Sequence, residues 1–311
     1  METAPLHEDI AHAPSGGAAH WLTTADGLRI RAAHWPLDGA KGTVLMFPGR
    51  TEYIEKYGHV AGEFAARGYA SAAIDWRGQG LAQRLMDNPG IGHVMEFTDY
   101  QSDVAALVAY AEEVGLPKPW YLLAHSMGGC IGLRALMEGL DVQAVSFSAP
   151  MWGVLITSAM RPLAWGLSSL SLRMGFDQKL SPGQTDEFFL LKTNFEQNLL
   201  TNDTEMFEDM RAQLIAHPEL GLGGPSLRWL NTALREMRAL NRKPSPEVPC
   251  LTWLGGREAI VDPERIRSRM ARWPNGRLRE VESGQHEMLM DTPEVRRMVI
   301  DEITEHFAAH P

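Results

Sequence analysis

The chain has 311 residues, 44% of them hydrophobic, which is enough for one large core or two modest ones. Its formal net charge of −10 argues against sequence-independent binding to nucleic acid or anionic lipid headgroups, since both favour basic surfaces. Cys130 and Cys250 lie far apart in apolar contexts and are expected to be buried free thiols. Residues 1–20 lack the features of a signal peptide, and no later run is apolar enough for a membrane span, so we expect a cytoplasmic protein.

The first half of the chain alternates strand and helix patterns. Residues 1–18, rich in Ala, Gly, His and Pro, are expected to form a flexible arm, and Trp21–Thr24 with Leu28–Trp35 predicts a hairpin. Further elements are predicted at Thr43–Phe47 (strand), Ile54–Arg67 (helix), Tyr69–Trp76 (strand), Asp99–Gly115 (helix), Pro119–His125 (strand) and Val142–Ser148 (strand). This alternation predicts the α/β class, with a mostly parallel central sheet flanked by helices.

The alternation stops after residue 150. Residues 151–246 contain only helical patterns, such as Thr204–Ala216 and Pro225–Leu240. Strand and helix patterns then resume at Val248–Leu254, Pro263–Trp273, Arg277–Val281 and Thr292–Ala308. We therefore expect an α/β core from residues 19–150 and 247–311, interrupted by a helical insert at 151–246 near the carboxyl edge of the sheet, where ligands bind in such folds.

A sharp turn with the sequence Ala124–His125–Ser126–Met127–Gly128–Gly129 connects one predicted strand to a helix. A small-x-Ser-x-Gly turn in this setting presents its serine as a nucleophile and requires small residues two places before and after it. Gly128 satisfies this requirement, whereas Ala124 stands where glycine is usual. The helix start adds free N–H groups and a partial positive charge beside the Ser126 oxygen. The alternative is a glycine-rich turn with a packing role only.

A serine nucleophile needs a base, normally a histidine that is oriented by a carboxylate. His286 directly follows the last predicted strand and is the expected base. The rival histidines are His217 in the insert and His306 and His310 in or after the final helix. A zinc motif at His286–Glu287 is incomplete because Met290 stands where its second histidine would be, so we expect no metal and no cofactor.

Two carboxylates compete for the role of the triad acid, which should follow the strand at 248–254. Glu258 comes first and lies within the turn after Gly255 and Gly256. Asp262 precedes Pro263 and has the position of a helix cap, a common structural role. We favour Glu258 and keep Asp262 as the alternative.

An acyl-transfer reaction also needs two N–H donors for the substrate oxyanion. One is expected from the backbone of Met127, which follows the nucleophile, and the other from the loop after the strand at 43–47. In that loop we nominate the Arg50 N–H, because Gly49 allows a close approach of the backbone. An ordinary Pro-Gly turn is the alternative.

Together these residues resemble α/β-hydrolases of the serine type, and more narrowly the bacterial lysophospholipase and monoacylglycerol lipase group. The resemblance extends from about Trp21 to Phe307 and rests on Pro48–Tyr53, Asp75–Gly80, Ala124–Gly129, Gly255–Asp262 and Gly284–Glu287. The chain departs from the pattern at Ala124, and at Glu258, where many relatives carry aspartate.

The resemblance implies a serine ester hydrolase that acts on lysophospholipid or monoacylglycerol through an acyl-enzyme. Residues 151–246 would form a cap over the site, leaving peripheral membrane contact open. Met151, Trp152 and Leu155, followed by Ile156, Met160, Leu163 and Trp165, would line an acyl pocket, unless they are core residues. Glu52 would brace the oxyanion loop through Lys56, and Asp75–Gly80 would be a structural loop.

Two other functions stay open at this point. The first is an aminopeptidase of the same fold, which would need acidic residues of the insert to bind a substrate amine; the candidates are Asp186, Glu187, Asp203, Glu205, Glu208 and Asp209. The second is a non-catalytic binding protein on a hydrolase scaffold. Dehalogenases and epoxide hydrolases of this fold are disfavoured because they carry aspartate at the nucleophile position.

Overall fold

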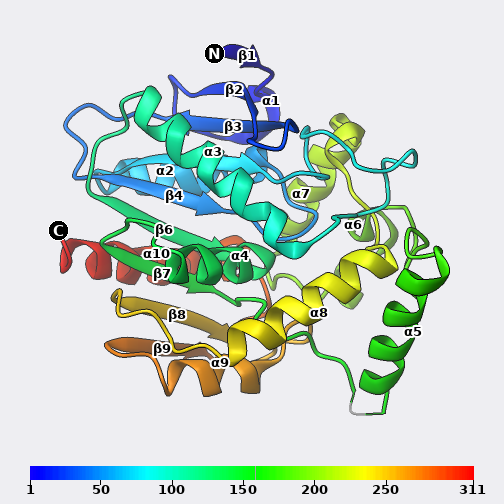
Figure 1. The fold of residues 1–311 in the computed structure, drawn as a ribbon. Coiled ribbons are helices and arrows are strands. Elements are labelled where there is room, and N and C mark those ends of the chain that lie inside the picture. Colours follow the sequence, from blue (N-terminus) through cyan, green and yellow to red (C-terminus); the bar gives the residue numbers. More distant parts are fainter. Residues whose placement is uncertain (158) are drawn as a thin grey trace.

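The computed structural model describes residues 1–157 and 159–311 and has a nine-stranded sheet in the order β1-β2-β3-β5-β4-β6-β7-β8-β9 (Figure 1). The strands are β1 (Glu2–Ala4), β2 (Ala18–Thr23), β3 (Arg29–Trp35), β4 (Thr43–Phe47), β5 (Ala70–Asp75), β6 (Trp120–His125), β7 (Ala144–Ser148), β8 (Cys250–Gly255) and β9 (Gly276–Val281). The pairs β1–β2, β2–β3 and β3–β5 are antiparallel, and every later pair is parallel. The predicted α/β class and mostly parallel sheet are confirmed.

Helices cover both faces of the sheet. The helices of the core are α2 (Gly58–Ala66), α3 (Tyr100–Glu113), α4 (Ser126–Met137), α9 (Pro263–Met270) and α10 (Pro293–Ala308). Side chains alternate along each strand, so that on β4 Leu45 and Phe47 face the cluster with α3, α4 and α9, while Val44 and Met46 face the cluster with α2 and α10. Both faces of the strands are therefore buried, as expected for parallel strands.

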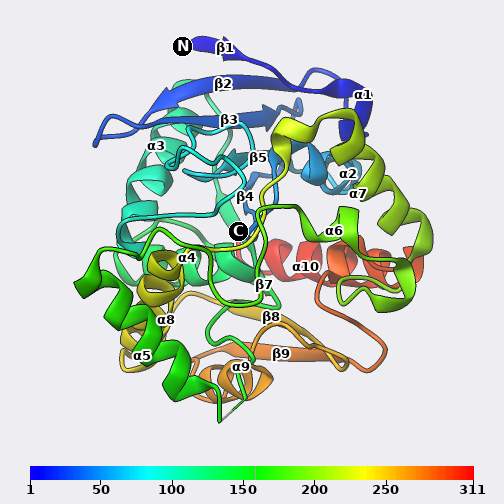
Figure 2. The same cartoon turned by 90° about the vertical axis from the view of Figure 1, so that its right-hand side faces the viewer.

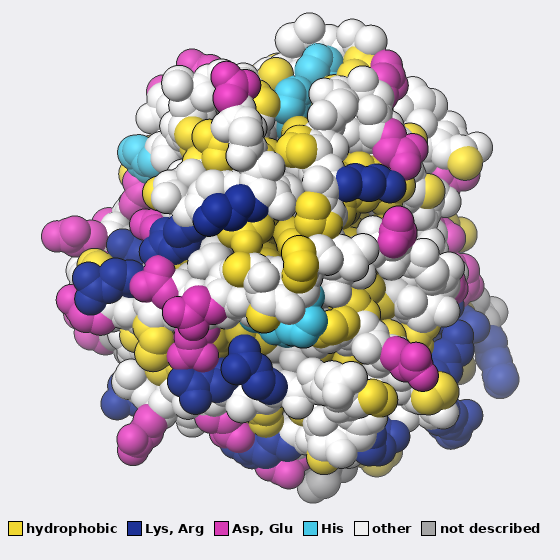
Figure 3. All heavy atoms as spheres, turned by 90° about the vertical axis from the view of Figure 1, so that its left-hand side faces the viewer, with side chains coloured by type: hydrophobic (Ala, Val, Ile, Leu, Met, Phe, Trp, Pro, Cys, Tyr) yellow, Lys and Arg dark blue, Asp and Glu magenta, His cyan; other side chains and the backbone are white. Residues whose placement is uncertain are grey.

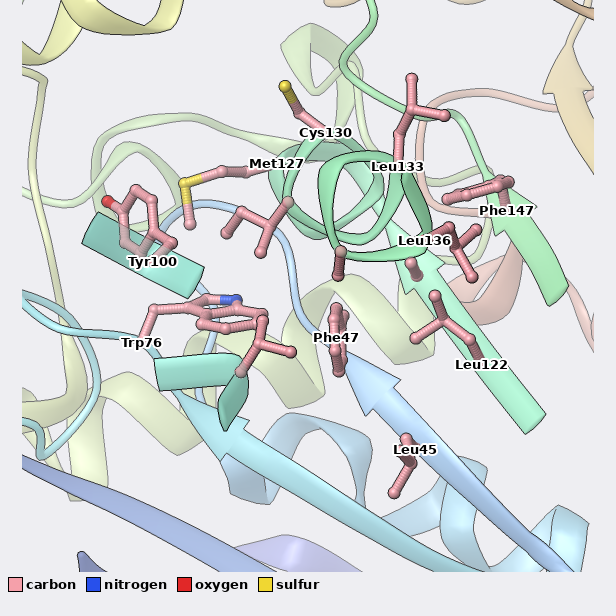
Figure 4. Packing of buried hydrophobic residues seen from close by; sticks show 14 of the residues in the cluster. Leu45, Phe47, Trp76, Tyr100, Leu122, Met127, Cys130, Leu133, Leu136 and Phe147 are labelled. Carbon is pink, nitrogen blue, oxygen red and sulfur yellow. The ribbon is translucent and has the colours of Figure 1, made fainter. Parts of the chain in front are cut away.

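The first of these clusters lies beneath the turn that carries Ser126. Figure 4 shows strand side chains packed with side chains of α4; the labelled strand residues are Leu45, Phe47, Leu122 and Phe147, and those of α4 are Met127, Cys130, Leu133 and Leu136. Cys130 and Cys250 are both buried free thiols, as predicted. This packing fixes the start of α4, and with it the nucleophile turn, against β4 and β6.

The amino-terminal residues are built into the fold, so the prediction of a flexible arm over 1–18 is wrong. Strand β1 pairs with β2, and α1 (Glu8–Ala11) buries Ile10 and Ala11. A buried arginine, Arg31, donates from Nη1 to the Pro5 carbonyl at 2.8 Å. Composition alone pointed to a loose segment because these contacts come from residues far along the chain.

Between β7 and β8 the described residues contain helices and no strand. They are α5 (Arg161–Met174), α6 (Phe189–Lys192), α7 (Thr204–Ala216) and α8 (Leu227–Asn241). Asp203 caps α7 by accepting from Glu205 N, and Ser226 caps α8 by accepting from Trp229 N at 3.1 Å. In Figure 2 these helices lie across the edge of the sheet at which the parallel strands end. The predicted helical insert therefore lies over the carboxyl edge.

The opposite face of the molecule, away from the helical insert, is not covered by these helices. In Figure 3 its acidic and basic side chains are interspersed, with apolar ones between them. A surface of this kind lacks the clustered positive charge of a nucleic-acid footprint. In the described part of the chain, no helix combines the length and the apolar character that crossing a bilayer requires.

Candidate active site

The serine turn has the backbone geometry that its sequence predicts. Ser126 is the first residue of α4 and has a φ of +47°, in the left-handed region that residues other than glycine rarely adopt. A Cβ at position 128 would lie 2.1 Å from the Phe47 carbonyl oxygen, so only glycine fits there. The unusual Ala124 faces Gly132, where even an added Cβ would lie 3.4 Å from the Ala124 methyl group, so this methyl group fits at the turn.

Three predicted residues form one hydrogen-bonded chain. His286 Nε2 lies 2.9 Å from Ser126 Oγ, and His286 Nδ1 lies 2.8 Å from Glu258 Oε2. The second carboxylate oxygen, Oε1, accepts from the N–H groups of Ile260 at 2.7 Å and Val261 at 3.0 Å. These two backbone donors hold the Glu258 carboxylate in place beside His286, so the three side chains have the order and contacts of a serine–histidine–acid triad.

Within this hydrogen-bonded triad, Glu258 and His286 each shift the pKa of the other. Burial acts to raise the pKa of Glu258, but the charge and hydrogen bond of His286 outweigh it and hold that pKa below its usual value. Burial conversely acts to lower the pKa of His286, and the neighbouring Glu258, with Glu287 and Glu52 behind it, raises it above the ordinary value. The carboxylate is thus ionised, and the imidazole is a stronger base than free histidine.

Asp262, the alternative acid, has a different position. Its Oδ1 accepts from Glu264 N at 3.1 Å and Arg265 N at 3.4 Å, which makes it the amino-terminal cap of α9. Its remaining oxygen lies 3.5 Å from an Arg161 nitrogen. The structure therefore brings Glu258, and not Asp262, to His286.

The loop that carries the nominated oxyanion donor is held by side chains from the segment after β5. Gln79 Nε2 donates to the carbonyl oxygens of Gly49 at 2.8 Å and Glu52 at 3.2 Å. Trp76 Nε1 donates to the Pro48 oxygen at 2.9 Å. On the other side, Met127 is the second residue of α4, where a helix has no internal partner for its N–H. Arg50 lines the same cavity as Ser126 and His286.

A buried charge network lies directly behind this loop. Glu52 accepts from the Gly49 N–H and from Tyr57 Oη, and Lys56 Nζ lies 2.7 Å from Glu52 Oε1. The same ammonium group lies 2.6 Å from Glu287 Oε2, next to His286 in sequence. Burial acts to raise the pKa of Glu52, but the charge of Lys56 outweighs it and lowers that pKa to about 2.

Glu52, Glu287 and His125 also have the spacing that a metal site would require. The Lys56 ammonium group already contacts both carboxylates and neutralises one of their two charges. A cation would have to displace a buried lysine from both partners to bind there. We therefore describe the cluster as a lysine-centred network that links the loop at 48–52 to His286.

A cavity of about 840 Å³ opens above Ser126 and His286. Its apolar lining comes mostly from the insert and includes Met151, Val154, Ile156, Met160, Leu163, Leu167, Phe188, Phe189, Leu190, Leu222 and Leu230. Of the three residues first expected to line the pocket, Met151 lies here, as do the neighbouring candidates Ile156, Met160 and Leu163. The lining residues at 188–190 and 222–230 were not predicted. The sequence of these segments alone does not show which of their side chains face the catalytic core.

The predictions for Trp152 and Leu155 are wrong. Trp152 packs edge-on to Phe147 with ring centroids 5.1 Å apart, stacks on Trp273 at 5.9 Å and donates to the Gly129 oxygen at 3.1 Å, so it belongs to the core beneath the insert. Leu155 is 54% exposed and lies outside the cavity. Trp165 lines a separate hollow with Trp152. Apolar composition did not distinguish core, pocket and exposed positions within one short segment.

A model of the Hydrolase_4 family, described as serine aminopeptidase S33, matches residues 38–293. The chain belongs to this family of α/β-hydrolases. Among its relatives, lysophospholipase L2 of Escherichia coli K12 is 28% identical over 306 residues, covering 93% of this chain and 87% of the relative. Monoacylglycerol lipase of Mycolicibacterium smegmatis is 24% identical and covers 94% and 97%.

Solved structures show the same fold for this α/β-hydrolase. A soluble variant of monoglyceride lipase from Saccharomyces cerevisiae, solved with a substrate analogue, superposes with a TM-score of 0.73. It is 20% identical and covers 99% of this chain and 98% of that structure. A monoacylglycerol lipase from Paleococcus ferrophilus gives a TM-score of 0.67 at 19% identity, with 91% and 99% covered. At these identities the likeness establishes the fold.

Proposed function

We propose that this protein is a serine ester hydrolase that cleaves single-chain lipid esters, either lysophospholipids or monoacylglycerols, through an acyl-enzyme. The observation that carries the proposal is the chain Ser126–His286–Glu258, with contacts of 2.9 and 2.8 Å, at the floor of an apolar cavity. The names of the relatives, lysophospholipase L2 and monoacylglycerol lipase, support the same class of substrate.

The geometry supports a mechanism in two halves. His286 Nε2 takes the proton from Ser126 Oγ as this oxygen attacks the ester carbonyl carbon, and the oxyanion accepts from the N–H groups of Arg50 and Met127. His286 then gives the proton to the leaving alcohol, which leaves an acyl-Ser126 ester. Water, deprotonated by His286, attacks the carbonyl carbon of that ester, the bond to Ser126 Oγ breaks, and Oγ takes the proton back from His286 as the fatty acid is released. Glu258 stays ionised and stabilises the imidazolium.

The cavity supports a substrate with one acyl chain. Its volume of about 840 Å³ lies in the range of small-molecule sites, and its lining is dominated by Leu, Met, Phe and Ile side chains of the insert. Burying a methylene group in such a lining contributes roughly 0.8 kcal/mol. We assign residues 151–246 as a cap that supplies this acyl site, with residues 19–150 and 247–311 as the catalytic core.

The outer face of α5 supports contact between the cap and a lipid surface. Leu170 and Met174 are exposed on this helix and lie outside the cavity lining, and the helix carries two arginines and no acidic residue. An apolar helix face with basic neighbours binds at a membrane interface. Replacing Leu170 and Met174 by serine should weaken sedimentation with phosphatidylglycerol vesicles without changing hydrolysis of a water-soluble acetyl ester. Unchanged sedimentation would remove α5 as the contact.

The family description keeps aminopeptidase as a second candidate. Recognition of a substrate amine requires a carboxylate that is free to pair with it. Of the six acidic candidates in the insert, only Glu187 lines the cavity, and it pairs with Lys192 at 2.9 Å. Asp203, by contrast, caps α7 and contacts Arg296 at 3.2 Å. These pairings favour ester over peptide substrates.

Fatty-acid release by purified protein tests the proposal directly. The panel consists of a monoacylglycerol, a lysophospholipid and a diacylphospholipid with the same acyl chain, together with an aminoacyl arylamide. We expect turnover of single-chain esters, little of the diacyl lipid and least of the arylamide. Faster cleavage of the arylamide would establish the aminopeptidase. Saturable lipid binding without any turnover would establish the non-catalytic binding protein.

A further inference from the structure

The side chain of Arg50 is a half-buried cation without a carboxylate partner among the described residues. Nη2 donates to the Gly223 carbonyl oxygen at 2.5 Å, and the group lies over the Trp229 ring, 5.2 Å from its centroid. Nε is buried and has no hydrogen-bond partner in the described structure. The side chain is therefore held in one orientation, with most of its five N–H donors unused.

Two other buried or half-buried arginines in the described structure have more hydrogen-bond acceptors than Arg50 has. Arg31 pairs with Glu55 at 2.7 Å and Asp75 at 2.8 Å, both buried carboxylates. Arg84 has no carboxylate partner, but it donates to four backbone carbonyl groups. Partial burial of an unpaired charge also costs free energy, so a half-buried guanidinium with a buried Nε and one acceptor among the described residues is suited to bind an anionic ligand.

The position of Arg50 indicates where such a ligand would lie. Arg50 lines the cavity that contains Ser126 and His286. Two further cations line this cavity, but Lys56 pairs with two carboxylates and Lys192 pairs with Glu187. Burial lowers the pKa of Arg50 to about 10, so the group is still charged at neutral pH. Within the described lining, Arg50 is thus the cation available to an anionic ligand.

We propose that the Arg50 guanidinium binds the phosphate of the substrate, so that the enzyme prefers lysophospholipids to monoacylglycerols. This inference rests on the proposed esterase function and adds a headgroup site to it. Guanidinium and phosphate match in planar, two-pronged hydrogen bonds, which an uncharged glycerol hydroxyl does not provide.

One residue would contact both ends of the headgroup. The backbone N–H of Arg50 is the nominated donor to the ester oxyanion, and its side chain extends towards Gly223 and Trp229 of the insert. In a lysophospholipid, only the glycerol carbons separate the ester from the phosphate. A substrate held by the backbone of Arg50 therefore brings its phosphate within reach of the side chain of the same residue, while the acyl chain occupies the apolar lining.

The test compares two substrates that differ by the phosphate alone, lysophosphatidic acid and monoacylglycerol with the same acyl chain. The ratio of their kcat/KM values is measured for wild type and for Arg50→Met, which keeps the backbone N–H. We expect the ratio to fall at least about tenfold, as for loss of a hydrogen bond to a charged group. Lys192→Met, which removes a paired cation from the same cavity, should leave the ratio unchanged. Equal losses for both substrates in Arg50→Met would overturn the proposal and assign Arg50 to loop support.

A binding measurement separates this inference from the catalytic proposal. Calorimetry on Ser126→Ala compares an alkyl phosphocholine with an alkyl glycerol ether of equal chain length, both below their micellar concentrations. We expect tighter binding of the phosphocholine, and loss of that preference in Ser126→Ala/Arg50→Met. Equal affinity of the two ligands in Ser126→Ala would overturn the phosphate site, whether or not wild type hydrolyses esters.

Inorganic phosphate alone distinguishes a lipid headgroup from free phosphate as the source of the anion. It lacks the chain that the apolar lining binds, so we expect no heat of binding at concentrations where the alkyl phosphocholine saturates. Tight binding of inorganic phosphate, with the alkyl chain adding nothing, would contradict a lipid headgroup site. Should Arg50→Met not fold, the comparison of ligands on Ser126→Ala still decides the question.

Discussion

Lys56 Nζ lies 2.6 Å from Glu287 Oε2, and this buried pair joins two loops of the active site that are 231 residues apart in sequence. Through Glu52, Lys56 also holds the loop that carries the nominated oxyanion donor, and Glu287 follows His286 directly. One ammonium group therefore connects the loop at 48–52 to the residue that follows His286.

Replacing Lys56 by methionine should lower kcat by about 10- to 100-fold with little change in KM, because small misplacements of catalytic groups are costly. Two buried carboxylates would lose their counter-charge, so we also expect the thermal midpoint to fall. Steady-state kinetics below that midpoint measure the effect. Lys41→Met, which removes an exposed lysine hydrogen-bonded to the Arg67 carbonyl, is the matched control and should change neither kinetic constant. A Lys56→Met enzyme with normal kcat would contradict the positioning role.

The direction in which the pH profile of kcat/KM shifts in two variants tests the same network. The base must be neutral to act, so kcat/KM falls as pH drops through the pKa of His286, which neighbouring carboxylates raise above that of free histidine. Removing the Lys56 charge leaves Glu52 and Glu287 less compensated and should move the acid limb to higher pH. Replacing Glu258 by glutamine removes the largest raising charge and should move the limb to lower pH. An acid limb that stays unchanged in both variants would exclude His286 as the titrating base.

Glu258→Gln should cost far more activity than Asp262→Asn. The first change removes the carboxylate that orients His286 and stabilises its charged form. The second removes the cap of α9 and should lower the stability by about 0.5–2 kcal/mol with little effect on kcat. Parallel measurements of kcat and of urea unfolding separate the two effects. The reverse ranking of kcat would make Asp262 the acid.

Chain length should control the efficiency of ester cleavage. Each methylene buried in the lining contributes roughly 0.8 kcal/mol, so kcat/KM for p-nitrophenyl esters should rise from acetyl upwards until the cavity is full. Met160 reaches into this cavity from the start of α5, and Met160→Trp should shift the optimum to shorter chains by filling space. A flat profile from acetyl to palmitoyl would contradict an acyl-binding cavity.

Local sequence patterns were sufficient to predict an element when the residues that form and end it lie within one segment. The strand at Thr43–Phe47 and the helix at Thr204–Ala216 have the predicted bounds, since a run of strand-forming residues and a capping aspartate mark them. The order of Ser126, Glu258 and His286 along the chain predicted a hydrogen-bonded chain, and the structure brings these side chains into contact. Their catalytic roles stay predictions.

Features that depend on contacts between distant segments could not be predicted from the sequence. The Lys56–Glu287 contact depends on which side chains the fold brings together, as does the lack of a carboxylate partner for Arg50 among the described residues. The amino-terminal strand forms only because β2 offers it an edge. Trp152 and Leu155 show the same limit, because their apolar character could not reveal that one faces the core and the other the solvent.

Active-site labelling tests the proposal that Ser126 is the nucleophile of an ester hydrolase. A fluorophosphonate probe should modify wild type at Ser126, as located by peptide mass spectrometry, and should not label Ser126→Ala. The same variant should keep its fold by circular dichroism while kcat falls by up to about 10⁶-fold. Labelling at another residue, with esterase activity retained in Ser126→Ala, would contradict the account.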